Sequence, residues 1–438
     1  MKLLYLLIAA LLLAGCWTKV PPLPDDIEQL YTINEECVGE ARKCYAQDDE
    51  KGAKLAAAKA RAAYKKLKKL GEKGERLINA QTAYRVADAY AEKTYEKRRY
   101  KKILAGWKAS GYMKARNAAL VLVFKGLGLA TEQIVKGRLH HLPDTVIEKT
   151  KLAADLVEKL GGPKKRADGK PDWAAISKHC FLVAKEPPAE LSIVVALGLV
   201  IAGKGDLALV ELKDVSLSQL SGEKRDVARI VRAVALVLAK LEQLAEDEFE
   251  KLHNPKNAGL DSQLRGGLHL FMAGLYIKKL RFLEADKALA RAVRACPNNS
   301  VVVYLTGERL AAQGKYEEAA KSLQRAASSN RQKWLAKQIA KRTRELRDNP
   351  QQMKPLVFDF RFVYKLVKAF LNCPSMKSKA AQRLKEWLSI ATRLSDEMWK
   401  HIPNKESLEN HGRRLWEKLP SWPAQKETTA SQSSEKLH

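Results

Sequence analysis

A pattern that occurs twice at a fixed offset constrains the fold of this chain more than any other feature of its sequence. The segments 280–293 and 314–327 superpose so that aromatic, small and leucine positions coincide. The members of each matched pair lie 34 residues apart, and the pairs are Phe282 and Tyr316, Ala285 and Ala319, Leu289 and Leu323, Ala292 and Ala326. Two copies of one pattern at a constant spacing predict two copies of one structural unit.

The spacing within each copy predicts an amphipathic α-helix. Apolar and small residues recur at steps of three and four, which places them on one face of a helix. The alanines on that face carry only a methyl group, so a neighbouring helix can approach closely. A second helical stretch precedes each copy, at residues 267–279 and 300–313. The predicted unit is therefore a helical hairpin that packs against further helices.

The two copies resemble the tetratricopeptide repeat, a helical hairpin with a period of 34 residues. That family has a Leu-Gly pair and a Tyr on its first helix, an aromatic residue and Ala on its second, and Pro at its end. The resemblance covers residues 266–330, and the second copy lacks the Trp and the closing Pro. The residues that we expect to pack the repeats are Ala273 (after Met272), Phe282, Ala285, Leu289, Ala292, Pro297, Gly307, Leu310, Gly314, Tyr316, Ala319, Leu323 and Ala326.

Stacked hairpins of this kind form a solenoid with a concave groove, which side chains of the first helices line. The resemblance implies such a groove here, with His269, Tyr276, Tyr304 and Glu308 as its candidate partner-binding residues. We expect a protein segment to lie in this groove and to be held by buried contact with the two tyrosines.

The N-terminus has the layout of a secretory signal that ends at a cysteine. One lysine precedes eleven apolar residues at positions 3–13, and small residues follow before Cys16. Leu13-Ala14-Gly15-Cys16 resembles the lipobox of bacterial lipoproteins. The resemblance implies that Cys16 becomes the first mature residue and carries a lipid, and that Trp17 favours the outer over the inner membrane. An ordinary signal peptide with an accidental cysteine is the alternative. No other apolar stretch is expected to approach the length of about 20 residues that spans a bilayer.

The composition predicts an all-α chain with long N-terminal helices. Apolar residues make up 46% of the chain and aromatic residues only 7%, while alternating β-branched runs are nearly absent. Two apolar runs, 117–123 and 192–202, could be strands by periodicity, but their Ala, Leu and Gly content favours buried helices. Proline and glycine breaks divide the chain into a signal peptide (1–15), a lipidated tether (16–25), a helical-hairpin region (26–260), the repeat pair (261–330), a C-terminal helical region (331–420) and a disordered tail (421–438).

Positive charge is the remaining strong signal, with a formal net charge of +29. Residues 61–102 alone hold fourteen Lys or Arg and five Asp or Glu. Such a field attracts polyanions, which makes an anionic polymer of the envelope one expected partner. The alternative is that these residues form solvated helix faces, because many of them lie within four positions of a Glu. Nucleic acid is disfavoured, since no recognised nucleic-acid-binding fold accompanies the charge.

No motif predicts catalysis, a metal site or a cofactor. The histidines show no His-Glu-x-x-His spacing, and neither Gly-x-Ser-x-Gly nor a phosphate-cradling Gly-rich loop occurs. Glu406-Ser407 resembles the Glu-Ser pair of lytic transglycosylases, but that family's Gly-Leu-Met-Gln continuation is missing. The five cysteines after Cys16 lack Cys-x-x-Cys spacing. We expect them to be buried free thiols, although bridges between segments remain open in an oxidising periplasm.

The expected function is that of a lipid-anchored scaffold or adaptor on the periplasmic face of the outer membrane. Its expected partners are other envelope proteins, in an assembly or pilotin-like role, with the inner membrane and the cell surface as alternative locations. A cationic binder of peptidoglycan or another glycan is the alternative function, and a cell-wall hydrolase is a distant third.

Overall fold

A computed structural model describes most of the chain between residues 20 and 418. The positions that it leaves undescribed within this span are 137–142, 163–165, 167, 169, 221, 254–260, 279–280, 298, 351–359, 374–375, 377 and 404. The signal peptide, Cys16, Trp17 and the tail at 421–438 all lie outside the described residues, so what was predicted for them stays a prediction.

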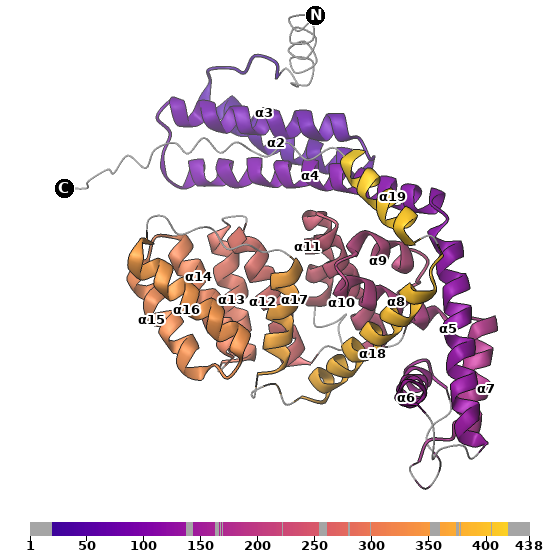
Figure 1. Cartoon of the computed structure of the whole chain (residues 1–438). Coiled ribbons are helices and arrows are strands. Elements are labelled where there is room, and N and C mark those ends of the chain that lie inside the picture. Colours follow the sequence, from indigo (N-terminus) through magenta and orange to yellow (C-terminus); the bar gives the residue numbers. More distant parts are fainter. Residues whose placement is uncertain are drawn as a thin grey trace, which may run out of the picture. The chain divides into compact units, whose positions relative to one another are not determined.

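The described residues form helices and contain no strand, which confirms the all-α prediction (Figure 1). Residues 117–123 and 192–202 both lie in helices, as their composition indicated. The helices are α2 (Ile27–Ala46), α3 (Glu50–Lys69), α4 (Gly74–Ala109), α5 (Tyr112–Val135), α6 (Asp144–Lys159), α7 (Trp173–Lys185), α8 (Ala189–Ile201), α9 (Gly205–Leu212), α10 (Gly222–Leu238), α11 (Glu242–His253), α12 (Ser262–Lys278), α13 (Phe282–Ala295), α14 (Ser300–Ala312), α15 (Tyr316–Ser329), α16 (Lys333–Asp348), α17 (Phe360–Leu371), α18 (Lys379–His401) and α19 (Lys405–Lys418).

The chain divides into two compact units. The first comprises residues 1–106 and 409–438, and the second comprises residues 107–408. The predicted helical region 26–260 therefore contributes to both units, and its long N-terminal helices α2, α3 and α4 are present, with α4 extending over 36 residues.

The first unit has a core made largely of alanine. Small side chains of α2, α3 and α4 meet there, with Ala41, Ala60 and Ala87 fully buried. Asn34 of α2 is buried beside them, and its amide donates a hydrogen bond of 2.8 Å to the carbonyl oxygen of Ala60 in α3. Methyl-sized side chains let the helix backbones approach closely, which is why three long helices with many lysines can still bury a continuous core.

The second unit consists of packed helical pairs. Helix α5 packs against α6, α7 and α18, while α8 packs against α9, α10 and α18. A glycine permits the closest of these approaches. A Cβ atom built on Gly198 of α8 would lie 2.5 Å from the carbonyl oxygen of Ala391 in α18. Because that oxygen belongs to the backbone, the two helices can pack in this way only where position 198 has no side chain.

The two repeat copies form consecutive helical pairs in the second unit. Helices α12 and α13 form one pair and α14 and α15 the next, with α16 packed against both α14 and α15. The second helices, α13 and α15, each contain 14 residues and begin at Phe282 and Tyr316. Both ends of these helices thus repeat at the offset of 34 residues that the sequence pattern predicts. Figure 1 shows α13 to α16 as neighbouring rods of similar length.

Candidate partner-binding site

The residues expected to pack the repeats occupy the positions that their pattern predicts. Those on the small-residue face are buried, whereas Phe282, Leu310 and Tyr316 are half-buried. Pro297 and Gly314 are exposed in the connections between helices, where Gly314 has a φ of 77° that suits glycine. The buried members are Ala273, Ala285, Leu289, Ala292, Gly307, Ala319, Leu323 and Ala326.

Three of the four residues predicted to line a partner groove lie in the interior instead. Tyr304 is 1% exposed and Glu308 is 2% exposed, and His269 is also buried. The expectation that Tyr304 and Glu308 offer an accessible surface is therefore wrong for this structure. The physical reason is α16, which packs against α14 and covers the face on which both side chains lie.

Glu308 and Arg342 form a buried ion pair between α14 and α16. The Arg342 Nε donates to Oε1 of Glu308 at 2.7 Å, and its Nη2 donates to Oε2 at 2.6 Å. The Arg342 Nη1 also donates to Glu345 within α16 at 2.6 Å. Burial and the neighbouring Glu308 carboxylate raise the pKa of Tyr304 far above its usual range. The first helix of the second copy is thus joined to the helix that follows the repeat pair.

Tyr276, the fourth predicted groove residue, is half-buried beneath an arginine. The Arg281 guanidinium lies 4.6 Å from the centre of the Tyr276 ring. Its Nη1 donates to Glu246 of α11 at 2.9 Å, and its Nε donates to Glu284 of α13 at 3.0 Å. Burial raises the pKa of Tyr276, and the Glu246 carboxylate adds to the effect. Tyr276 therefore serves as a contact between successive helices of the stack.

The exposed apolar side chains of the repeat pair lie on α13. Leu283 is 66% exposed, and Val293 and Ala290 are exposed further along the same helix. Sequence reasoning missed them because the repeat pattern directs attention to the small-residue face. Their helical phase was the available signal, since none of them lies on that face. The exposed charged residues between and beside them are Lys287, Arg291 and Arg294.

Many of the positive charges between residues 61 and 102 are engaged in ion pairs. In the first unit the Arg61 guanidinium lies 2.6 Å from the Asp88 carboxylate. Asp48 receives both Lys97 and Lys101. Further pairs join Lys66 to Asp25, Arg76 to Glu28 and Arg98 to Glu50. These contacts agree with the alternative of solvated helix faces, whereas Lys65, Lys68 and Lys69 remain exposed at the end of α3.

The five described cysteines are free thiols, as predicted. Cys44 is half-buried, and Cys37, Cys180, Cys296 and Cys373 are buried. Burial raises the pKa of Cys37 and Cys296 to about 11 and that of Cys180 to about 12. Such thiols remain protonated at neutral pH and react slowly. Among the described residues, no group of three or more His, Cys, Asp or Glu side chains could hold a metal ion.

One described helix, α5, is long and apolar enough to cross a membrane by length and composition. The expectation that no stretch besides the signal approaches spanning length is therefore wrong. Within its most apolar window, 44% of the residues are buried against other helices of the second unit. The buried Arg116 near its start donates from Nη2 to Glu211 of α9 at 2.5 Å. A charge neutralised in this way interrupts the apolar run in the sequence without interrupting the helix.

Comparison of the chain with models of protein families, with curated proteins and with solved structures finds no match. The function therefore has to be argued from the residues described above.

Proposed function

We propose that this chain is a lipid-anchored adaptor of the bacterial cell envelope, which holds other envelope proteins on the outer face of its helical-repeat stack. The observation that carries the proposal is the exposed apolar surface of α13 on a stack that buried ion pairs hold together. A rigid surface loses little conformational entropy when a partner binds, so more of the contact energy appears as affinity.

The outer face of α13 has the chemistry of a protein contact. Leu283, Ala290 and Val293 supply apolar area, and the exposed Lys287, Arg291 and Arg294 surround it with positive charge. An exposed leucine gains free energy when a partner covers it. Surrounding charges of one sign select a partner of the opposite sign. The proposed partner is accordingly a protein segment with an apolar centre and acidic flanks.

The proposed anchor is the lipid on Cys16, because the residues that precede it match the lipobox. Attachment at the N-terminus would leave the helical units free to face the periplasm, which is where the proposed partners lie. The outer membrane is the proposed location, in keeping with Trp17 at the position after the cysteine.

Crosslinking in intact cells tests the proposal. We expect Leu283→Glu to abolish the crosslinked partner band, because it places a charge in the apolar centre of the contact. Ile78→Glu is the matched control, since Ile78 of α4 is 61% exposed and belongs to the first unit. Neither substitution should change the melting temperature, because exposed positions tolerate such changes. Equal crosslinking of both variants and the wild-type chain would rule out the α13 surface.

The anionic-polymer alternative has a different dependence on salt and on charge. It would require the exposed Lys65, Lys68 and Lys69, and binding to a polyanion weakens steeply as salt is raised. Reversing all three lysines to Glu should leave the crosslinked protein partner in place. Loss of envelope binding in this triple variant, with retention in Leu283→Glu, would favour the polymer and contradict the adaptor.

A further inference from the structure

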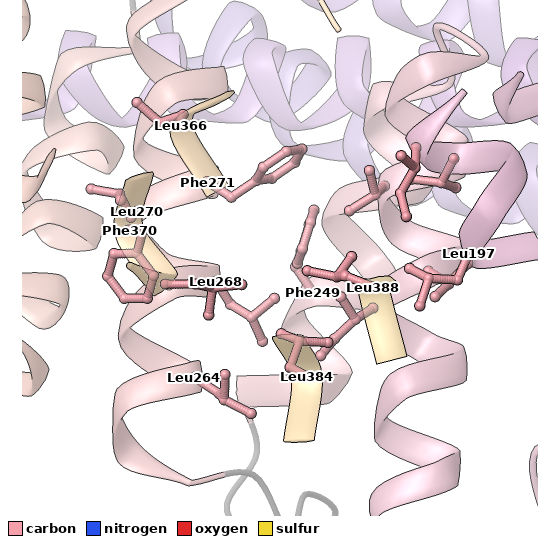
Figure 2. Close-up of a pocket in the computed structure, with 17 residues that line it drawn as sticks. Leu197, Phe249, Leu264, Leu268, Leu270, Phe271, Leu366, Phe370, Leu384 and Leu388 are labelled. Carbon is pink, nitrogen blue, oxygen red and sulfur yellow. The ribbon is translucent and has the colours of Figure 1, made fainter. Parts of the chain in front are cut away.

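The second unit encloses a cavity that the repeat pattern does not predict. Its volume is about 120 Å³, and the 17 residues around it come from α8, α10, α11, α12, α17 and α18. Figure 2 shows side chains from these helices converging on the space, among them Leu268 of α12, Phe249 of α11 and Leu384 of α18. It lies apart from the small-residue face that packs the repeats and from the outer face of α13.

The lining is entirely apolar. Its members are Leu, Ile, Val, Phe and one glycine, so no side chain there can donate or accept a hydrogen bond. Phe249 and Phe271 lie with their ring centres 5.2 Å apart at one wall. At another, a Cβ atom built on Gly267 would lie 2.7 Å from the Phe370 ring. A water molecule needs two to four polar partners, so this cavity suits an apolar occupant.

The size of the cavity limits that occupant. An apolar cavity of roughly 150 Å³ is known to bind benzene, so a space of about 120 Å³ accepts a small hydrocarbon or a segment of an alkyl chain. Several lining side chains are only half-buried, which shows where solvent reaches the cavity. These rim residues are Ile201, Ile230, Val234, Leu264, Leu384 and Leu388. A chain could therefore end inside the cavity and leave through this rim.

The charges beside the rim have one sign. Every charged residue that directly adjoins one of the six rim residues in the sequence is basic, namely Arg229, Arg265, Arg383 and Lys385. The nearest acidic neighbour on α18, Glu386, receives a hydrogen bond of 3.0 Å from Lys159. An anionic head group on the occupant would therefore meet complementary charge.

We propose that the cavity binds a fatty-acid-like ligand, with its alkyl chain among the leucines and phenylalanines and its anionic head at the basic rim. This site is separate from the protein contact on α13, so either can fail without the other. It would give the chain a second role as a lipid-binding protein.

Calorimetric titration tests the proposal with two probes that share a chain and differ in the head. The full-length chain would carry Cys16→Ser, so that no covalent acyl chain can fill the cavity. We expect decanoate to bind with one site per chain and decyltrimethylammonium to bind about tenfold more weakly or worse. Absence of decanoate binding would overturn the proposal, and equal affinity for the two probes would overturn the role of the basic rim.

Cavity-filling variants locate the bound chain. Leu268→Trp should lower the affinity for decanoate by about tenfold or more, whereas Leu129→Trp on the exposed face of α5 should not. Val234→Phe at the half-buried rim is the second filling variant and decides the question if Leu268→Trp does not fold. Lys385→Glu should weaken decanoate alone, with Lys178→Glu on α7 as its control. A folded filling variant that binds decanoate as tightly as the wild-type chain would place the ligand elsewhere and overturn the proposal.

Discussion

Glu308 and Arg342, which lie 34 residues apart, meet in a buried ion pair made by two nitrogen–oxygen contacts. One residue belongs to the first helix of the second repeat copy, and the other occupies the equivalent position one period later. The period therefore continues past Asn330 in the charge pattern after the aromatic and alanine pattern has ended.

Removal of one partner of this pair should be costly. Arg342→Met leaves the Glu308 carboxylate buried without its counter-charge, and we expect the free energy of unfolding to fall by about 3–5 kcal/mol. Combining it with Glu308→Leu should recover most of that loss, because no buried charge then remains. Urea unfolding of the single and double variants measures both effects. A single variant as stable as the wild-type chain would show that the carboxylate is hydrated in solution.

The small residues between α14 and α15 should resist enlargement. A Cβ atom built on Gly307 would lie 2.9 Å from Cδ2 of Leu323, and Ala319 is fully buried beside this contact. We expect Ala319→Leu to lower the free energy of unfolding by about 1–3 kcal/mol through overpacking. Ala290→Leu, on the exposed face of α13, is the matched control. Equal melting temperatures for the two variants would contradict the close approach of α14 and α15.

Asp48 should titrate well below an ordinary aspartate. Hydrogen bonds from Lys101 and Lys97 lower the pKa of its carboxyl from 3.8 to about 2. A carboxyl whose pKa is lower in the folded than in the unfolded chain stabilises the fold above its unfolded pKa. That contribution is lost as the pH falls from about 4 through about 2. Carbon-detected NMR titration of Asp48 measures the midpoint directly, and a midpoint at the ordinary aspartate value would mean that the lysine contacts do not persist.

Asp48→Asn provides the matching stability test. Asp48 has a φ of 57°, a left-handed conformation that asparagine also tolerates, so the substitution should remove the charge without straining the backbone. We expect this variant to lose less stability than the wild-type chain between about pH 4 and about pH 2. Thermal melts across this range measure the difference.

The buried thiols should be protected from modification. Cys44, which is half-buried, should react first with a disulfide reagent at neutral pH, and the buried Cys37 and Cys180 should react only as the chain opens. Addition of urea should therefore release the remaining thiols together with the loss of helical circular dichroism. Rapid reaction of all five described thiols in native buffer would contradict their burial.

The helices were more accessible to prediction than the surfaces. The start of α13 at Phe282 and of α15 at Tyr316 follows from local periodicity, because the residues that specify each helix lie within it. The burial of Tyr304 depends on α16, a separate helix with a weak repeat pattern, so no local signal could reveal it. Similarly, the length of α5 was underestimated because Arg116 looks like a break until Glu211 of α9 is seen to pair with it.

The pair between Glu308 and Arg342 also determines where the chain can be cut. A fragment that stops at Asn330, where the aromatic and alanine pattern stops, would leave a carboxylate without its guanidinium and bring Tyr304 to the surface. The shortest fragment that keeps this region dry extends through α16 to Asp348. The cooperative folding unit is therefore longer than the repeat motif, and expression boundaries drawn from the motif alone would divide it.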